Sequence, residues 1–377
     1  MIRAAIASIL FVAATAEECP CPTGKTLRIG GVSHGNVADA FWDPVYAAAE
    51  RAALDSGVEL DFDRYDMSSS QTDQGGQDII SWMVDRIEKL CTGDKNAVDG
   101  LFSTINDAAI LAALETNCLA NDIPTVVINA GGNLVQEPQD DGNNFLHFIG
   151  ADDYNTGKES GERLVEECPT CKRFYCLDHC SNCTSWFERC RGFGDAVGEA
   201  YGQAIQIVDD SKEAYIASVE NVIGANSTWD DVGLLLGAQQ SLVLFAEALR
   251  EKYNGVKIAG IDTSPGLYDL LDIPDWLWGT SQEAYLQGYY PVQMLTNTIR
   301  MAQNLQTFNL MTGPTFVTEK VSECYSDPFQ GCVADDTQNP PTETVPPTAL
   351  GEPSPGARKL ASVTTRLVSV ALRLFGI

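Results

Sequence analysis

The amino-acid sequence predicts an α/β protein made of two doubly wound parallel-sheet lobes that a hinge joins. Short apolar, β-branched runs alternate with longer helical stretches along most of the chain, which is typical of strands covered by helices. The same alternation starts again after residue 145, so the pattern occurs twice. A chain of 377 residues is long enough for two such domains, each with its own core.

The individual elements follow from this alternation. In the first half we expect strand 27–32, helix 44–54, strand 58–62, helix 78–90, strand 100–102, helix 108–119 and strand 125–128. In the second half we expect strand 148–149, helix 157–166, strand 173–175, helix 193–201, strand 205–208, a continuation of the pattern over 232–250, and strand 256–261. Residues 145–150 would make the first crossing between the halves.

The expected domain organisation has five parts. Residues 1–16 have the positive start, apolar core and small-residue cleavage site of a secretory signal peptide, and a buried N-terminal strand or helix is the other interpretation. The others are an N-terminal lobe of residues 24–144 plus 283–311, a C-terminal lobe of residues 145–282 plus 312–335, a disordered Pro/Thr-rich stalk of residues 336–357 and an amphipathic tail of residues 358–377. The tail is either a marginal helix or an interfacial anchor that touches a membrane.

The charge of the chain limits its partners. Lys and Arg number 24 against 52 Asp and Glu, which gives a net charge of −28. Nucleic acids and anionic lipids would be repelled, so neither is an expected partner. With the signal peptide, this composition indicates a secreted, extracellular or cell-surface protein, or a periplasmic one if the source is bacterial.

The cysteine content agrees with an oxidising compartment, because the count of twelve is even. Cys91 and Cys118 flank one strand–helix unit and could pair. Two cysteines near the start could reach two near the end of the chain, namely Cys19 and Cys21 with Cys324 and Cys332. Six others crowd into one segment: Cys168, Cys171, Cys176, Cys180, Cys183 and Cys190.

Zinc is an alternative for that segment, because two C-x-x-C spacings lie beside His179. We favour disulfides, since the signal peptide places the segment in an oxidising compartment. Two sequons, at Asn182 and Asn226, mark expected glycosylation sites of a secreted protein.

Candidate binding groups stand where strands end, because ligands of open α/β sheets lie at the carboxyl ends of the strands. Asp39, Phe41 and Trp42 follow the first strand, and the two aromatic rings can clamp the apolar faces of a sugar ring. Ser103 and Asn129 end two further strands, and Asp262 ends the strand 256–261. Carboxylates, amides and ring faces together favour a small, neutral, polyhydroxylated ligand over an anionic one.

The order of these groups resembles the periplasmic sugar-binding protein family of the ribose/galactose type, over roughly residues 27–317. The most specific motif is Gln282-x-x-Tyr285 followed by Gly288-Tyr289, and Arg189-x-x-Gly192-Phe193 and Gly260-Ile261-Asp262 are the others.

The resemblance implies roles for single residues. Arg189 would donate to ligand hydroxyls, as its planar fork of N–H groups suits adjacent oxygens. Gln282 would bond the ligand, and Gly288 would allow close helix packing. Asp39, the aromatic pair, Asn129 and Asp262 match ligand-contacting positions of the family. Asp230 matches another such position, with a register uncertain by one residue.

Two further positions receive lesser roles. Asp152 would mainly cap a helix at the hinge and is a weak ligand candidate. Arg191 would point to solvent, away from Arg189.

The sequence therefore predicts a secreted protein that closes two lobes around a small sugar or cyclitol, with no cofactor or metal. It could deliver the ligand to a transporter or to a signalling partner. A cell-surface receptor or adhesion module that binds a protein is the alternative function. An enzyme acting on glycosides is the least favoured, since neither a Ser-His-Asp arrangement nor a phosphate-binding loop is identifiable.

Overall fold

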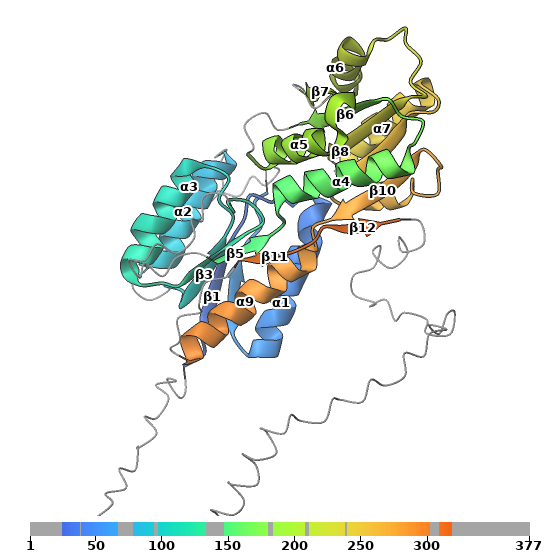
Figure 1. Cartoon of the computed structure of the whole chain (residues 1–377). Coiled ribbons are helices and arrows are strands. Elements are labelled where there is room, and N and C mark those ends of the chain that lie inside the picture. Colours follow the sequence, from blue (N-terminus) through green and yellow to red (C-terminus); the bar gives the residue numbers. More distant parts are fainter. Residues whose placement is uncertain are drawn as a thin grey trace, which may run out of the picture. The chain divides into compact units, whose positions relative to one another are not determined.

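The computed structural model describes residues 25–37, 39–66, 78–93, 97–132, 147–179, 184–207, 211–237, 240–301 and 309–318. They form two six-stranded sheets with helices on both faces (Figure 1). All neighbouring strands run parallel except β10 and β12. The predicted fold of two parallel-sheet α/β lobes is confirmed.

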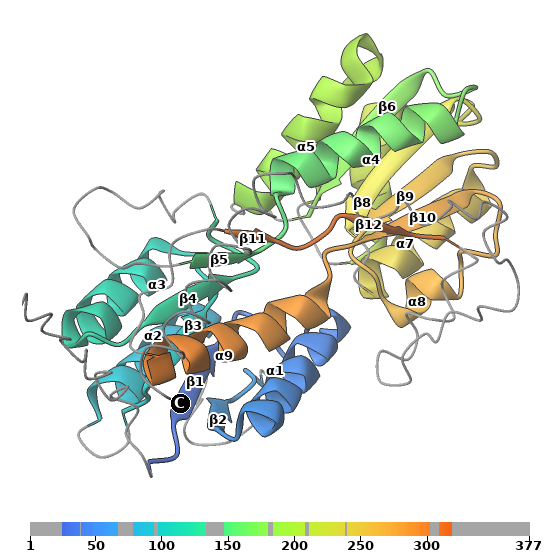
Figure 2. The same ribbon diagram turned by 60° about the horizontal axis from the view of Figure 1, so that its bottom comes forward.

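The first lobe is the sheet with strand order β11-β5-β4-β3-β1-β2, together with the α-helices that pack on it. Its strands are β1 (Arg28–Val32), β2 (Glu59–Phe62), β3 (Gly100–Ser103), β4 (Thr125–Ile128), β5 (His147–Gly150) and β11 (Leu310–Met311). Its helices are α1 (Asp43–Ser56), α2 (Ile79–Thr92), α3 (Ala108–Ala113) and α9 (Ala284–Met301). Helices α1 and α9 pack together on one face, and α2 and α3 cover the other (Figure 2).

The strands of this sheet are apolar on both sides, as expected for a sheet that helices cover twice. Leu101 of β3 packs among side chains of α2 and α3, whereas its neighbour Phe102 packs among those of α1 and α9. Val126 and Val127 of β4 divide in the same way. Successive strand residues point to opposite faces, so a run without polar residues fills two cores.

The second lobe is the sheet with strand order β12-β10-β9-β8-β6-β7, together with the α-helices that pack on it. Its strands are β6 (Arg173–Asp178), β7 (Tyr201–Gln206), β8 (Val232–Gly237), β9 (Lys257–Ile261), β10 (Trp276–Ser281) and β12 (Thr315–Val317). Its helices are α4 (Asp153–Glu167), α5 (Thr184–Val197), α6 (Lys212–Ile223), α7 (Gln240–Lys252) and α8 (Pro265–Tyr268). Helices α4 and α5 cover one face, and α6, α7 and α8 lie on the other.

The chain passes between the lobes three times. The passages follow β5, join β10 to α9, and join β11 to β12. The sequence analysis placed residues 145–150 at the start of the second half, but β5 pairs with β4 and β11 in the first sheet. The first passage therefore begins after Gly150. An apolar strand carries no local signal of the sheet that it joins, and this explains the difference.

Two elements of the second half also differ from expectation. Helix α5 begins at Thr184 rather than at residue 193, and residues Tyr201–Gln206 form β7 instead of ending that helix. The cysteine-rich segment before α5 hid the helix start, because its composition is typical of a loop. The expected continuation over 232–250 is strand β8 followed by helix α7.

Close helix contacts depend on glycine in both lobes. A β-carbon on Gly192 of α5 would lie 2.0 Å from the carbonyl oxygen of Tyr154 in α4. A β-carbon on Gly288 of α9 would lie 2.0 Å from the carbonyl oxygen of Val45 in α1, so Gly288 allows helix packing as predicted. Both glycines stand in the motifs on which the family resemblance rests, and packing alone accounts for them.

Several predictions lie outside the described residues. These are the signal peptide 1–16, the stalk 336–357, the tail 358–377, the sequon at Asn182, and cysteines 19, 21, 180, 183, 324 and 332. Asn226 is described and lies in the turn between α6 and β8.

Candidate functional site

A cavity of about 450 Å³ lies between the two lobes, at the carboxyl ends of several strands. Its first-lobe lining is His34, Asp39, Phe41, Trp42, Ile105, Asn106, Asp107, Ala108, Leu111, Asn129, Ala130 and Gly131. Its second-lobe and interlobe lining is Asp153, His179, Thr184, Ser185, Trp186, Arg189, Asp262 and Gln282. Seven of the nine predicted ligand-binding residues therefore line one cavity: Asp39, Phe41, Trp42, Asn129, Arg189, Asp262 and Gln282.

The turn after β1 supplies the aromatic side of the cavity. Asp39 caps the 3₁₀ turn Ala40–Trp42, because its Oδ1 accepts the N–H of Phe41 at 3.1 Å. Phe41 is partly exposed and lies edge-on against Trp42, with ring centroids 5.3 Å apart. Trp42 is only 1% exposed and also packs against His34, at 5.0 Å between centroids. Phe41 is therefore the more accessible of the two rings, although both line the cavity, and a clamp formed by both rings stays a prediction.

Asn129 occupies the end of β4 in the left-handed conformation, with φ of 58°. Its Nδ2 donates to Oε1 of Gln287 at 3.1 Å. The Nε2 of Gln287 in turn donates to the carbonyl oxygen of Gln282 at 2.8 Å and to the hydroxyl of Thr312 at 3.0 Å. Gln287 is buried, so this network fixes the Asn129 side chain and two passages between the lobes together.

Arg189 organises the second-lobe side. Its Nε donates to Oδ1 of Asp153 at 2.7 Å, and its Nη2 donates to Oε1 of Gln282 at 3.0 Å. Its Nη1 lies 4.0 Å from Oδ2 of Asp262, whose other carboxylate oxygen accepts from Nε2 of Gln282. Asp262, like Asn129, ends its strand with a positive φ, here 77°. Non-glycine residues in that region are uncommon and concentrate at functional sites.

Burial sets the charge states around the cavity. It lowers the pKa of His34 and of His179 to about 4, so both imidazoles are neutral at pH 7. It also raises the pKa of Asp153 and of Asp262, and the guanidinium of Arg189 opposes both shifts. For Arg189, burial acts to lower the pKa, but Asp153 and Asp262 outweigh it and raise the pKa.

Several lining residues were not among those predicted from the sequence. Trp186 lies one helical turn before Arg189, whose guanidinium carbon sits 5.0 Å from the Trp186 ring centroid. Asp153 directly follows the helix cap Asp152 and binds Arg189. The position of Trp186 three residues before Arg189, on the same helix face, is the signal in the sequence that could have identified it as a lining residue. Asn106 and Asp107, after β3, were also missed, although the rule that ligands meet strand ends applies to them.

Two predicted site residues lie away from the cavity. Ser103 is fully buried in β3, and its hydroxyl donates to the carbonyl oxygen of Thr104 at 3.0 Å. Asp230 is exposed at the amino end of β8, beside Gly255, so its assignment as a ligand residue is wrong. The motif match placed it before a helix, but the strand β8 stands between Asp230 and helix α7. Its neighbour Asp231 pairs with Arg173 at 2.5 Å and is not available either.

Two secondary assignments hold. Asp152 caps α4, with its Oδ1 accepting from the N–H of Asn155 at 2.9 Å, and it does not line the cavity. Arg191 has a side chain 53% exposed and pairs with Glu188 at 2.5 Å, so it points away from Arg189.

Three cysteine pairs are bonded in the structure. Cys91 is joined to Cys118, Cys168 to Cys171, and Cys176 to Cys190. The last pair ties strand β6 to helix α5 immediately after Arg189. Within the described ranges, no group of three or more His, Cys, Asp or Glu has a geometry that could hold a metal ion. Of the helices described, none is long and apolar enough to cross a membrane.

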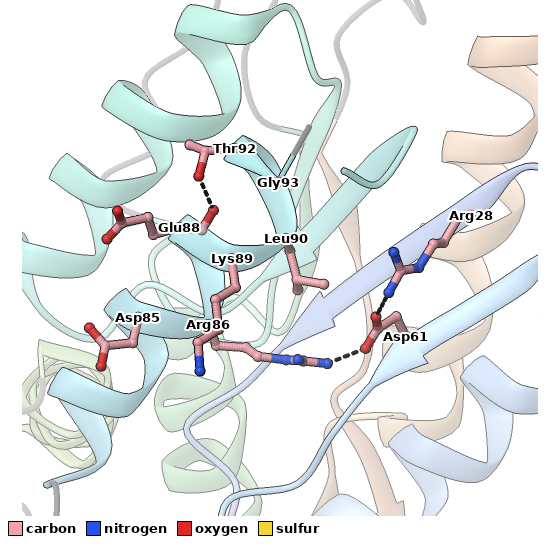
Figure 3. Close-up of a pocket in the computed structure, with 9 residues that line it drawn as sticks. All are labelled: Arg28, Asp61, Asp85, Arg86, Glu88, Lys89, Leu90, Thr92 and Gly93. Atoms are coloured by element: carbon pink, nitrogen blue, oxygen red, sulfur yellow. Dashed lines mark hydrogen bonds and ion pairs between the residues drawn. The ribbon is translucent and has the colours of Figure 1, made fainter. Parts of the chain in front are cut away.

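A second hollow, of about 610 Å³, lies in the first lobe alone and is lined by charged residues of opposite sign. Figure 3 shows Arg28 of β1 and Arg86 of α2 both reaching the carboxylate of Asp61 in β2. Arg86 also lies 2.8 Å from Asp63. These ion pairs hold β1, β2 and α2 together, and the group has a structural role.

The fold and cavity define the class of two-lobe α/β proteins with a cleft between the lobes. The chain belongs to the periplasmic binding protein domain family, whose model matches residues 29–303. Several solved structures share the fold. One is a carbohydrate transporter from Acidothermus cellulolyticus in complex with myo-inositol, at 20% identity and a TM-score of 0.65, covering 80% of this chain and 97% of that one.

Two other solved structures are similar to the same extent. The glucose-galactose binding protein GanP from Geobacillus stearothermophilus is 18% identical, with a TM-score of 0.61, and the match covers 78% of this chain and 98% of that one. An ABC transporter solute-binding protein from Actinobacillus succinogenes, with bound D-allose, is 15% identical, with a TM-score of 0.63. The match covers 80% of this chain and 100% of that one. A search of curated proteins gave no match.

Proposed function

We propose that the protein binds a small sugar or cyclitol without negative charge in the cavity between its two lobes. One observation carries the proposal. Arg189, Asp262 and Gln282 converge on the cavity from the second lobe, and Asp39, Phe41 and Asn129 line it from the first. Guanidinium, carboxylate and amide groups form paired hydrogen bonds with adjacent hydroxyls, while an aromatic ring covers the apolar face of a pyranose or cyclitol.

The ligand types of the related structures support the same class. Proteins of this fold are described with myo-inositol, with D-allose and as binders of glucose and galactose. The family is one of solute-binding proteins, and we propose that this chain likewise binds without turnover. Membership implies a periplasmic or extracellular location, which agrees with a secreted protein that passes its ligand to a transporter or a signalling partner.

Closure of the lobes is the mechanism that we propose. The three passages provide the hinge, and Gln282 lies on one of them while Asp153 directly follows another. A ligand that contacts both lobes binds the closed form more tightly and shifts the population toward it.

Isothermal titration calorimetry with D-glucose, D-galactose, D-allose, D-arabinose and myo-inositol tests the proposal. We expect saturable binding of at least one of them, and no conversion of the bound compound on prolonged incubation. Binding that disappears in Arg189→Ala while Arg191→Ala keeps it would place the ligand in this cavity. Absence of binding across the panel would overturn the proposal.

A further inference from the structure

The lining of the cavity carries an excess of negative charge. Four acids line it, namely Asp39, Asp107, Asp153 and Asp262. Among the described lining residues, Arg189 is the sole cation. His34 and His179 add no positive charge at pH 7, since burial lowers the pKa of each to about 4. A ligand that brings only hydroxyls leaves this imbalance unchanged.

The guanidinium of Arg189 already interacts with two carboxylates on its own side of the cavity. Its Nε bonds Asp153 at 2.7 Å, and its Nη1 lies 4.0 Å from Asp262. Both carboxylates belong to the side of the cavity that Arg189 occupies. The guanidinium therefore compensates the negative charge of its own side of the cavity and leaves the carboxylates of the opposite lobe, Asp39 and Asp107, to other partners.

Asp39 is the less exposed of these two carboxylates, and no described residue forms an ion pair with it. Its Oδ1 accepts one backbone N–H, from Phe41. The nearby cation Arg64 pairs instead with Asp43 at 2.6 Å and donates to the backbone carbonyl oxygen of Asp39, not to its side chain. Burial, with Asp262 as a further contribution, raises the pKa of Asp39, while the Phe41 N–H and Arg64 act to lower it.

A second group in the lining also lacks a partner. The Nδ1 atom of His179 is buried without a hydrogen bond to any described residue, and His179 lines the cavity from the end of β6. Its ring packs edge-on against Trp186, with centroids 4.6 Å apart. This nitrogen lies beside Gly237 of β8, where an added β-carbon would be 2.9 Å away, so β8 shields it and it takes no part in the contact proposed below.

We propose that the ligand of this cavity is an amino sugar or aminocyclitol whose protonated amine binds the carboxylate of Asp39. This inference rests on the proposed function, because it names the ligand class of the same site. An ammonium group has three donors and one positive charge, and it supplies the counter-charge that the first lobe lacks. The hydroxyls of the same ligand can then contact Arg189 and Gln282.

The experiment compares three forms of the same ring by calorimetry at about pH 6.5, where an amine of this type is protonated. They are D-glucose, D-glucosamine and N-acetyl-D-glucosamine, with the corresponding galactose and mannose series. We expect the amine to bind at least about tenfold more tightly than its parent hexose in the best series. The N-acetyl form has no charge and should lose that advantage.

A matched pair of variants identifies the carboxylate. Asp39→Asn removes the charge and keeps an acceptor for the Phe41 N–H, so the turn is retained. It should bring the affinities of amine and hexose to within about threefold, which is less than 1 kcal/mol. Asp107→Asn removes one charge from the same cavity but at an exposed helix cap of α3, and it should leave the preference for the amine in place.

The outcomes separate this inference from the function on which it rests. Hexoses or myo-inositol that bind as tightly as the amines, or an amine preference that survives Asp39→Asn, would overturn the inference and leave the proposed function standing. Absence of binding by every hexose, amine and cyclitol would overturn both.

Discussion

Replacing Arg189 by alanine is the most informative change in the cavity. In the binding reaction it removes a charged donor, and one hydrogen bond to a charged group contributes about 1.5–3 kcal/mol. At 1.4 kcal/mol for each factor of ten, the Kd should rise about 10- to 150-fold. The change also leaves Asp153 and Asp262 without their shared cation, and breaking a buried pair costs roughly 3–5 kcal/mol of folding free energy.

The two effects need separate assays. Calorimetry gives the Kd, and urea unfolding followed by circular dichroism gives the free energy of unfolding. Arg189→Lys is the second variant, since it keeps the charge but loses the planar fork and should also weaken binding. Arg191→Ala is the control, because Arg191 is exposed and forms a surface ion pair with Glu188, so its loss should change stability by less than about 1 kcal/mol. A folded Arg189→Ala protein with unchanged affinity would refute the reasoning.

Three further predictions concern stability. Replacing Cys176 and Cys190 together by alanine should lower the free energy of unfolding by about 3 kcal/mol, because the bond closes a loop of 14 residues, and urea unfolding checks this. The same change should weaken ligand binding through α5, which calorimetry checks. Asp39→Asn should stabilise the protein at pH 7, because the raised pKa of Asp39 means that the folded state binds its proton more tightly than the unfolded state does, and its contribution to stability falls as pH rises. The gain should vanish below about pH 4, where both states are protonated, and a constant gain across the pH range would contradict it. Gly192→Ala should cost about 1–3 kcal/mol, because its methyl group meets the Tyr154 carbonyl, and an unchanged melting temperature would contradict that packing.

The fold could be predicted from sequence because the apolar runs are short and the helices between them have clear ends. The strand over residues 125–128, for example, is fully buried and β-branched, and its bounds agree with β4. Aspartates at helix starts, such as Asp78 and Asp107, mark where α2 and α3 begin. A buried β-branched strand or a helix-capping aspartate is recognisable from a few neighbouring residues.

Assignments that depend on the pairing of strands far apart in the sequence were harder to predict from the sequence. Nothing in the sequence around β5 indicates that it pairs with β4 and β11, since both neighbours lie elsewhere in the chain. Asp230 was misplaced for a related reason, because a motif gives the order of elements but not the end of the strand at which a residue lies. Asp230 lies at the amino end of β8, whereas the cavity lies at the carboxyl ends of the strands, so Asp230 does not reach it.

The cavity itself was predictable only at strand ends. Asn129 and Asp262 directly follow strands and were found by that rule. Asp153 and Trp186 lie on helices, and their side chains reach the cavity only because α4 and α5 cross closely at Gly192. The helix crossing is a tertiary property, so these two residues became visible only in three dimensions.

Small-angle X-ray scattering of the wild-type protein, with and without a saturating ligand identified by calorimetry, tests the central claim most directly. If the ligand lies between the lobes and contacts both, it stabilises a closed form, and the radius of gyration should decrease on binding. Arg189→Ala at the same ligand concentration should keep the radius of the ligand-free protein. An identical scattering profile with a ligand that demonstrably binds the wild-type protein would contradict closure of the lobes around the ligand.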